Sequence, residues 1–251
     1  MAHEPTISSN SAFGPTRWTL VVRSQGNTPE ARAALSELCE AYYQPVFAFL
    51  RREGRDEEAA RELAHDFFAY LLERGTVGNA DPLRGRFRSY LLGALKHYLA
   101  DRREREGRLK RGGGLIIESL DAPLEGKDAQ IERDVASAAD TVPDTWFDRQ
   151  WALTVMARAL SSLEAQFAGE ERSEQYTVLK PWLAGDASAL NPTAAAERLG
   201  LSESAFKVAV HRLRKRFRET VQREVAQTMP EGADLHEELR YLVEVLASAP
   251  R

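Results

Sequence analysis

Apolar residues spaced three and four positions apart along most of the chain constrain the fold more than any other feature. Between Asp56 and Glu73 they fall at Ala60, Leu63, Ala64, Phe67, Phe68, Leu71 and Leu72. This spacing places them on one stripe of a helix. The alternating pattern of a strand is almost absent elsewhere. The sequence therefore predicts an all-α fold built from amphipathic helices.

Segments rich in helix-breaking residues divide the chain into two small helical domains joined by a flexible linker. Residues 107–145 contain three consecutive glycines, two prolines and many acidic residues, a composition typical of linkers. We predict a disordered N-terminus at 1–15, a helical domain at 16–106, the linker at 107–145, a second helical domain at 146–228 and a C-terminal amphipathic extension at 229–251. The helices expected in the first domain cover 16–24, 29–52, 56–73 and 87–105, and the extension forms a helix at 233–247.

Composition excludes several classes of protein. Cys39 is the only cysteine, so an intramolecular disulfide is impossible and a cysteine-based zinc site is not expected. No apolar run reaches the roughly 18 residues that cross a bilayer, and the first residues lack the pattern of a signal peptide. We therefore expect a reducing, cytoplasmic setting without membrane contact. The five histidines show no metal-ligand spacing, and neither a phosphate-binding glycine loop nor a nucleophile elbow occurs, which predicts a non-enzyme without metal or cofactor.

The strongest local motif runs from Thr193 to Arg214. Gly200 can take the left-handed conformation that ends a helix, and Ser202 is a favourable N-cap for the next helix. The inward stripe of that second helix is expected to comprise Phe206, Val210, Leu213 and Phe217. The outward face then carries Ser204, Lys207, His211, Arg212, Arg214, Lys215 and Arg218. Polar groups near the start and cations further along suit a helix-turn-helix recognition helix in a DNA major groove; a solvated basic helix in an ordinary bundle is the alternative.

A second concentration of basic residues surrounds the predicted helix at 87–105. Its members are Arg84, Arg86, Arg88, Lys96, His97, Arg102, Arg103 and Arg105. Basic residues interleaved with aromatics suit a nucleic-acid surface. Tyr90 and Tyr98 fall on the apolar stripe, however, so they are expected in the core rather than stacked on bases. A solvated charged face remains the alternative for the cations.

Taken in order, these parts resemble the extracytoplasmic-function (group IV) sigma factors of the sigma-70 family. The segment Leu63 to Phe68 occupies the place of the family's polymerase-binding helix motif. Residues 81–103 resemble its promoter-melting and −10-recognising segment, and Phe206 to Arg214 resemble its −35-recognising helix. The resemblance covers 16–106 and 146–228.

The resemblance implies two partners, core RNA polymerase and promoter DNA, and a role for each matched position. Polymerase docking would involve Arg61, Glu62, His65 and Asp66. The −10 element would be bound by Asn79, Arg84, Arg86, Arg88, Lys96, His97, Arg102 and Arg103. The −35 element would be bound by Ser204, Lys207, His211, Arg212, Arg214 and Lys215. An anti-sigma factor or a Ser/Thr kinase would be the regulating partner.

One departure from the family pattern concerns residues 59–62. The family usually carries an acidic segment there, whereas this chain has two alanines followed by Arg61 and Glu62. We hypothesise that polymerase docking needs added negative charge, such as phosphorylation of a nearby Ser or Thr, or an unusual polymerase surface. On this hypothesis, Arg61→Glu strengthens binding to core polymerase.

Two other functions are compatible with the same sequence. A stand-alone helix-turn-helix regulator that binds operators as a dimer would explain Thr193 to Arg218 but leaves the first domain without a role. A protein-interaction adaptor built on the sigma scaffold is the other alternative. The helix at 233–247 is expected to pack on its own domain, although it could instead bind a regulator or mask DNA-binding residues.

Overall fold

The computed structural model describes residues 28–74, 86–110, 144–183, 191–230 and 232–248. Throughout these ranges the regular elements are helices, without a strand, which confirms the all-α prediction. The expected helix at 16–24, the N-terminus at 1–15, most of the linker, Asn79 and Arg84 lie outside the described residues. None of the helices that the structure describes has the length and apolarity needed to span a membrane.

Three helices form the N-terminal part of the fold: α2 (Pro29–Arg52), α3 (Glu57–Arg74) and α4 (Phe87–Lys110). Gly54, with φ of +85°, makes the turn after α2, and the Asp56 carboxylate accepts a 2.8 Å hydrogen bond from the Ala59 amide at the start of α3. Such a side chain satisfies one of the free amides of a helix N-terminus. α4 continues to Lys110, beyond the predicted end at 105 and into the segment expected to be linker.

Five further helices and one 3-10 turn follow in the C-terminal part. They are α6 (Thr145–Gly169), α7 (Ser173–Leu179) with the 3-10 helix η3 (Lys180–Leu183), α8 (Pro192–Arg198), α9 (Glu203–Ala226) and α10 (Leu235–Ala247). The side chains of Asp144, Asn191, Ser202 and Asp234 cap α6, α8, α9 and α10. Each capping oxygen accepts an amide hydrogen bond in the first turn, so local sequence fixes where these helices begin.

The larger hydrophobic core joins the two predicted domains. It includes Leu38 and Tyr42 from α2, Phe67 from α3, Leu95 from α4 and Trp151 from α6, together with residues of α9 and α10. At the junction of α2 and α6, the rings of Phe49 and Phe147 meet edge to face with centroids 6.2 Å apart. The division at 107–145 therefore does not separate two independent cores among the described residues.

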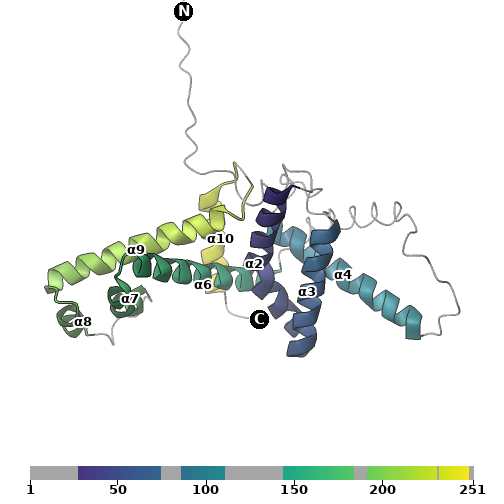
Figure 1. Ribbon diagram of the computed structural model, residues 1–251, viewed down its shortest axis with the longest axis horizontal. Coiled ribbons are helices and arrows are strands. Elements are labelled where there is room, and N and C mark those ends of the chain that lie inside the picture. Colours follow the sequence, from purple (N-terminus) through teal and green to yellow (C-terminus); the bar gives the residue numbers. More distant parts are fainter. Residues whose placement is uncertain (1–27, 75–85, 111–143, 184–190, 231, 249–251) are drawn as a thin grey trace, which may run out of the picture.

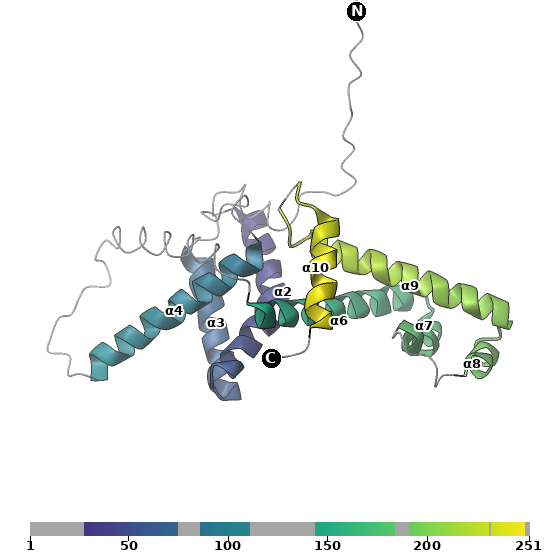
Figure 2. The same ribbon diagram turned by 180° about the vertical axis from the view of Figure 1, so that it is seen from behind.

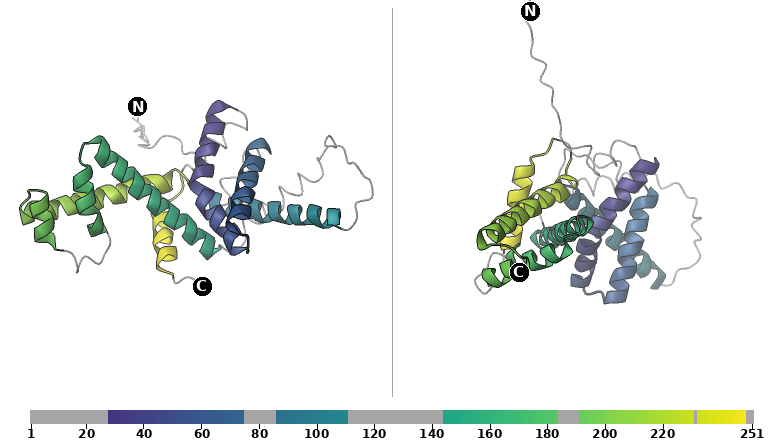
Figure 3. Two further views of the ribbon diagram at one scale, coloured as in Figure 1. Left: turned by 60° about the horizontal axis from the view of Figure 1, so that its bottom comes forward. Right: turned by 60° about the vertical axis from the view of Figure 1, so that its left-hand side comes forward.

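A second, smaller core lies wholly in the C-terminal part. It contains Leu163 and Phe167 of α6, Tyr176 and Leu179 of α7, and Phe206 of α9, with Ala195 and Ala196 of α8 beside them. Figures 1 and 2 show α6 and α9 running together toward this end, where α7 and α8 lie. Figure 3 shows that α4 extends at the opposite end of the molecule.

Candidate nucleic-acid interface

The connection between α8 and α9 has the geometry that the sequence predicts. Gly200 adopts φ of +65°. Its amide donates to the Glu197 carbonyl at 2.9 Å, and the Leu201 amide donates to the Ala196 carbonyl at 2.9 Å. This pair of hydrogen bonds is the Schellman ending of a helix. Ser202 Oγ then accepts from the Ala205 amide at 3.3 Å and begins α9, so both the predicted helix end and the predicted N-cap are confirmed.

The two faces of α9 separate as predicted. Phe206, Val210 and Leu213 are buried and Phe217 is half-buried. The cationic and polar residues on the opposite side are all exposed: Ser204, Lys207, His211, Arg212, Arg214, Lys215 and Arg218. Lys207, His211 and Arg212 form no ion pair with the residues that the structure describes, whereas Lys215 lies 3.8 Å from Glu219. The exposed face of α9 is therefore strongly basic.

Two contacts hold the start of α9 against its neighbours. The Trp182 and Phe206 rings meet edge to face at 5.0 Å, and Thr193 Oγ1 donates to the Glu203 carboxylate at 2.9 Å. Arg214 Nε also donates to the Trp182 carbonyl at 2.9 Å. Part of the Arg214 hydrogen-bonding capacity thus serves the packing of η3 on α9, which makes Arg214 less available to DNA than Lys207 or Arg212.

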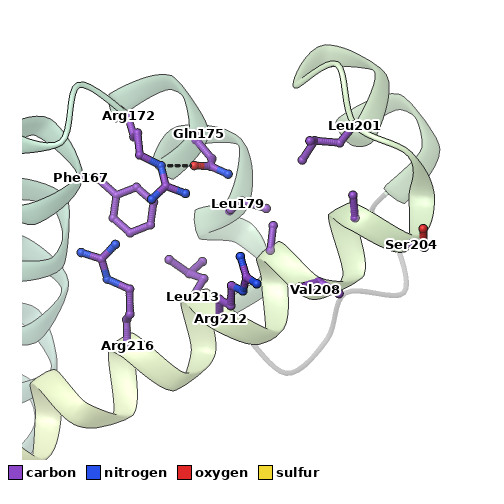
Figure 4. Close-up of a pocket in the computed structure, with 12 residues that line it drawn as sticks. Phe167, Arg172, Gln175, Leu179, Leu201, Ser204, Val208, Arg212, Leu213 and Arg216 are labelled. Atoms are coloured by element: carbon purple, nitrogen blue, oxygen red, sulfur yellow. Dashed lines mark hydrogen bonds between the residues drawn. The ribbon is translucent and has the colours of Figure 1, made fainter.

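A groove of about 530 Å³ lies beside the exposed face of α9, between α9 and the end of α6. Figure 4 shows Ser204, Val208 and Arg212 along one side of it and Phe167 and Arg172 along the other. Arg216, which sequence analysis did not single out, donates to the Glu170 carboxylate at 2.7 Å, and its guanidinium lies 4.5 Å from the Phe167 ring centre. Arg216 therefore joins α9 to α6 rather than extending the basic face.

Gly200→Ala is expected to lower the free energy of unfolding by about 1–2 kcal/mol, because a residue with a Cβ is strained at φ of +65°. Nothing lies within 4 Å of the added methyl, so the loss reports backbone strain alone. Gly169→Ala, within α6 and equally free of contacts, should be neutral or stabilising. Urea unfolding of both variants measures the difference, and equal effects would contradict the prediction.

The residues predicted to bind polymerase lie on α3, and their surroundings differ. Arg61 and Glu62 are exposed, and Arg61 Nη2 contacts the Glu57 carboxylate at 2.6 Å. His65 Nε2 shares a 3.2 Å hydrogen bond with the Tyr43 hydroxyl of α2. Asp66 accepts a 2.7 Å hydrogen bond from Arg102 of α4. Arg61, Glu62 and His65 are therefore exposed on one helix. The fourth side chain, Asp66, is half-buried and joins α3 to α4.

The later basic residues of α4 remain accessible to different degrees. Lys96 and Arg103 are exposed, and Arg103 lies 3.4 Å from Glu53. His97 is half-buried, 3.6 Å from Asp101. Arg102 is held by Asp66, and this hydrogen bond is the main reason that its pKa is raised. Lys96 and Arg103 thus extend from α4 into solvent, whereas Arg102 is committed to the α3–α4 contact.

Arg88 departs most from the prediction of a DNA-binding side chain, since it is only 2% exposed. Its Nε donates to Asp148 of α6 at 2.8 Å and its Nη1 donates to Glu238 of α10. Trp151 lies beneath it, with the guanidinium carbon 4.3 Å from the ring centre. Arg88 cannot reach DNA in this arrangement, because α6 and α10, two helices distant from it in sequence, enclose it.

Arg86 and Tyr241 complete this buried group, named here the Arg88 cluster: Arg86, Arg88, Asp148, Glu238 and Tyr241. Half-buried Arg86 donates to Glu238 at 2.8 Å and lies 4.2 Å from the Tyr241 ring centre. The Tyr241 hydroxyl donates to Asp148. Two guanidinium groups thus face two carboxylates, and the charges balance within the cluster.

The electrostatics of the Arg88 cluster follow from burial and charge. Burial by itself lowers the pKa of Arg88, but the Glu238 and Asp148 carboxylates outweigh burial and raise it. Burial, together with the hydrogen bond to Asp148, raises the pKa of Tyr241 to about 12. Arg88 is therefore charged and Tyr241 is neutral at physiological pH. Arg88 Nη2 finds no hydrogen-bond partner among the residues described.

The described part of the chain contains no group of three or more His, Cys, Asp or Glu side chains placed to hold a metal ion. The features that remain are the exposed basic face of α9, the exposed parts of α3 and α4, and the Arg88 cluster between them. Comparisons of the chain with protein-family models, with curated proteins and with solved structures found no match.

Proposed function

We propose that this chain is a transcription initiation factor of the sigma type, which binds core RNA polymerase and directs promoter recognition, DNA melting and initiation. The observation that carries the proposal is the basic face of α9. A helix that follows a tight turn presents Lys207, His211 and Arg212 to solvent without acidic partners among the described residues. Long cationic side chains on such a helix suit phosphates and base edges in a major groove.

The N-terminal helices support initiation over simple DNA binding. α3 presents Arg61, Glu62 and His65 to solvent on one side of the fold, and α4 presents Lys96 and Arg103. A protein that only binds an operator needs none of these surfaces. A factor that must dock on polymerase and also contact the separated strands needs both.

Co-elution of the purified chain with core RNA polymerase on a sizing column tests the proposal. Stoichiometric co-elution, followed by run-off transcription that depends on the chain, is the expected result. A chain that never enters the polymerase fraction, whatever its charge on α3, would overturn the proposal.

Arg61→Glu is expected to strengthen binding to core polymerase several-fold at low salt, because it restores negative charge to α3. It also removes the 2.6 Å contact of Arg61 with Glu57, which leaves that carboxylate available. Arg240→Glu is the matched control. Arg240 is an exposed arginine on α10 that lies 3.9 Å from Glu244, also four residues away, so this variant changes net charge equally. If both variants bind polymerase alike, net charge rather than the α3 surface is responsible.

A stand-alone DNA-binding regulator is the second candidate, and the Arg88 cluster is the observation that favours it. With Arg86 and Arg88 held by carboxylates, the helices α8 and α9 present the more accessible basic surface. A regulator of this kind would bind a palindromic duplex as a dimer without polymerase. If the chain is a monomer that does not bind duplex DNA until polymerase is added, initiation is favoured instead.

A further inference from the structure

The C-terminal end of α10 is held by the larger core and by Arg149 of α6. Leu242 and Val245 are buried against the larger core. Arg149 of α6 donates to the carbonyls of Val245, Leu246 and Ser248 at 3.3, 2.7 and 2.6 Å. A guanidinium satisfies the free carbonyls of a helix end and complements its dipole. Figure 2 shows α10 crossing α6.

The first turns of α10 are fastened to α4. The Glu238 carboxylate, buried at 5% exposure, binds Arg86 with one oxygen and Arg88 with the other. Tyr241, one turn later, lies over Arg86 and donates its hydroxyl to Asp148. One face of α10 thus contacts both guanidinium groups, of which Arg88 is buried and Arg86 is half-buried.

A carboxylate and a phosphate are the two anions that guanidinium groups bind with the same forked geometry. Glu238 therefore occupies the place on Arg86 and Arg88 that a DNA phosphate would take. A buried ion pair adds little net stability compared with other ways of filling the same space. Exchange of Glu238 for a phosphate is consequently feasible, since each guanidinium keeps an anionic partner.

α10 packs on α6 and α9, and its displacement breaks the contacts that it makes with them. It begins after a short connection that contains Gly232, with φ of +85°, and its outer face is polar or exposed, with Val243 at 62% exposure. The contacts that would break are the apolar ones of Leu242 and Val245, those of the partly buried Leu235, Leu239 and Leu246, and the polar ones of Glu238, Tyr241 and Arg149.

We propose that α10 is an autoinhibitory helix, in which Glu238 and Tyr241 cover Arg86 and Arg88 and keep them from the DNA backbone until α10 is displaced. This inference rests on the proposed function, which assigns Arg86 and Arg88 to DNA. The arrangement described here is then the resting state of the chain. In this state α9 is exposed, whereas α10 covers the arginines at the start of α4.

Glu238→Gln tests the proposal, because it removes the charge that holds both arginines and keeps the shape of the side chain. Affinity is measured by fluorescence anisotropy with a labelled DNA duplex that carries a central unpaired stretch, without polymerase. We expect at least about tenfold tighter binding, as the fraction of binding-competent molecules rises. Adding Arg86→Ala to this variant should abolish the gain. Glu237→Gln, an exposed neighbour on α10, should bind like the unmodified chain.

Arg149→Gln provides a second route to the displaced state, since it releases the C-terminal end of α10 without changing any residue of the Arg88 cluster. Hydrogen exchange of the α10 amides reports the opening directly. Faster exchange at residues 235–247 with unchanged DNA affinity would overturn the inference, and so would unchanged exchange in both variants. Tighter DNA binding without polymerase co-elution would leave the inference standing and remove the sigma function. Polymerase co-elution with unchanged DNA binding would overturn the inference and leave the sigma function standing.

Discussion

Arg88→Ala is expected to lower the free energy of unfolding by about 3–5 kcal/mol, which is the usual effect of removing one partner from a buried charge group. The variant leaves Asp148 without its guanidinium partner and Glu238 with Arg86 alone, and both carboxylates are nearly inaccessible. It also removes the contact with the Trp151 ring. Urea unfolding at neutral pH measures the change, because the denaturant midpoint should fall with little change in slope.

Two controls separate charge from packing in this prediction. Lys96→Ala removes an exposed cation from the same helix and should alter stability by no more than about 0.5 kcal/mol. The triple variant Arg88→Met, Asp148→Asn, Glu238→Gln replaces every charge that meets Arg88 and should recover most of the loss. A triple variant as unstable as Arg88→Ala would show that packing, and not uncompensated charge, accounts for the effect.

Local chemistry made the α8–α9 connection predictable. The position of Gly200 ahead of a Ser N-cap specifies where one helix ends and the next begins, and both features depend only on neighbouring residues. The three- and four-residue spacing on α9 likewise identified which side chains are buried. These predictions needed no knowledge of how distant segments pack.

The spacing of residues around Arg88 indicates that it is buried, although its charge favoured an exposed, DNA-binding role. Arg88 precedes Leu91, Leu92 and Leu95 by three, four and seven positions, so it belongs to the buried stripe of α4. Asp148 precedes Trp151, Ala152 and Val155 by the same three spacings. Glu238 likewise precedes Tyr241, Leu242 and Val245. A charged residue on an apolar stripe indicates a buried partner of opposite charge.

The identity of those partners could not be predicted from local patterns. Arg88 meets Asp148 60 positions away and Glu238 150 positions away. Which stripes face one another depends on the joint packing of α4, α6 and α10 in one core. For the same reason, local patterns could not reveal that the segments on either side of 107–145 share that core.

Neutralising Lys207, Arg212 and Lys215 together is expected to weaken binding to duplex DNA on the order of 10²-fold near physiological salt. These three cations are exposed on α9, and neither Lys207 nor Arg212 forms an ion pair with a described residue. If each contacts a phosphate, the slope of log affinity against log salt concentration should fall in magnitude by about 3. Arg214 and Arg216 are left in place because they bind Trp182 and Glu170 within the protein.

A second triple variant with the same change in net charge gives the control for this prediction. Arg61, Lys180 and Arg240 are exposed and already paired with nearby carboxylates, and their replacement by alanine should leave both the affinity and the salt slope nearly unchanged. Equal losses in the two variants would mean that the chain attracts DNA through its overall charge. A loss confined to the α9 variant assigns the DNA contact to that helix, because only the placement of the charges differs between them.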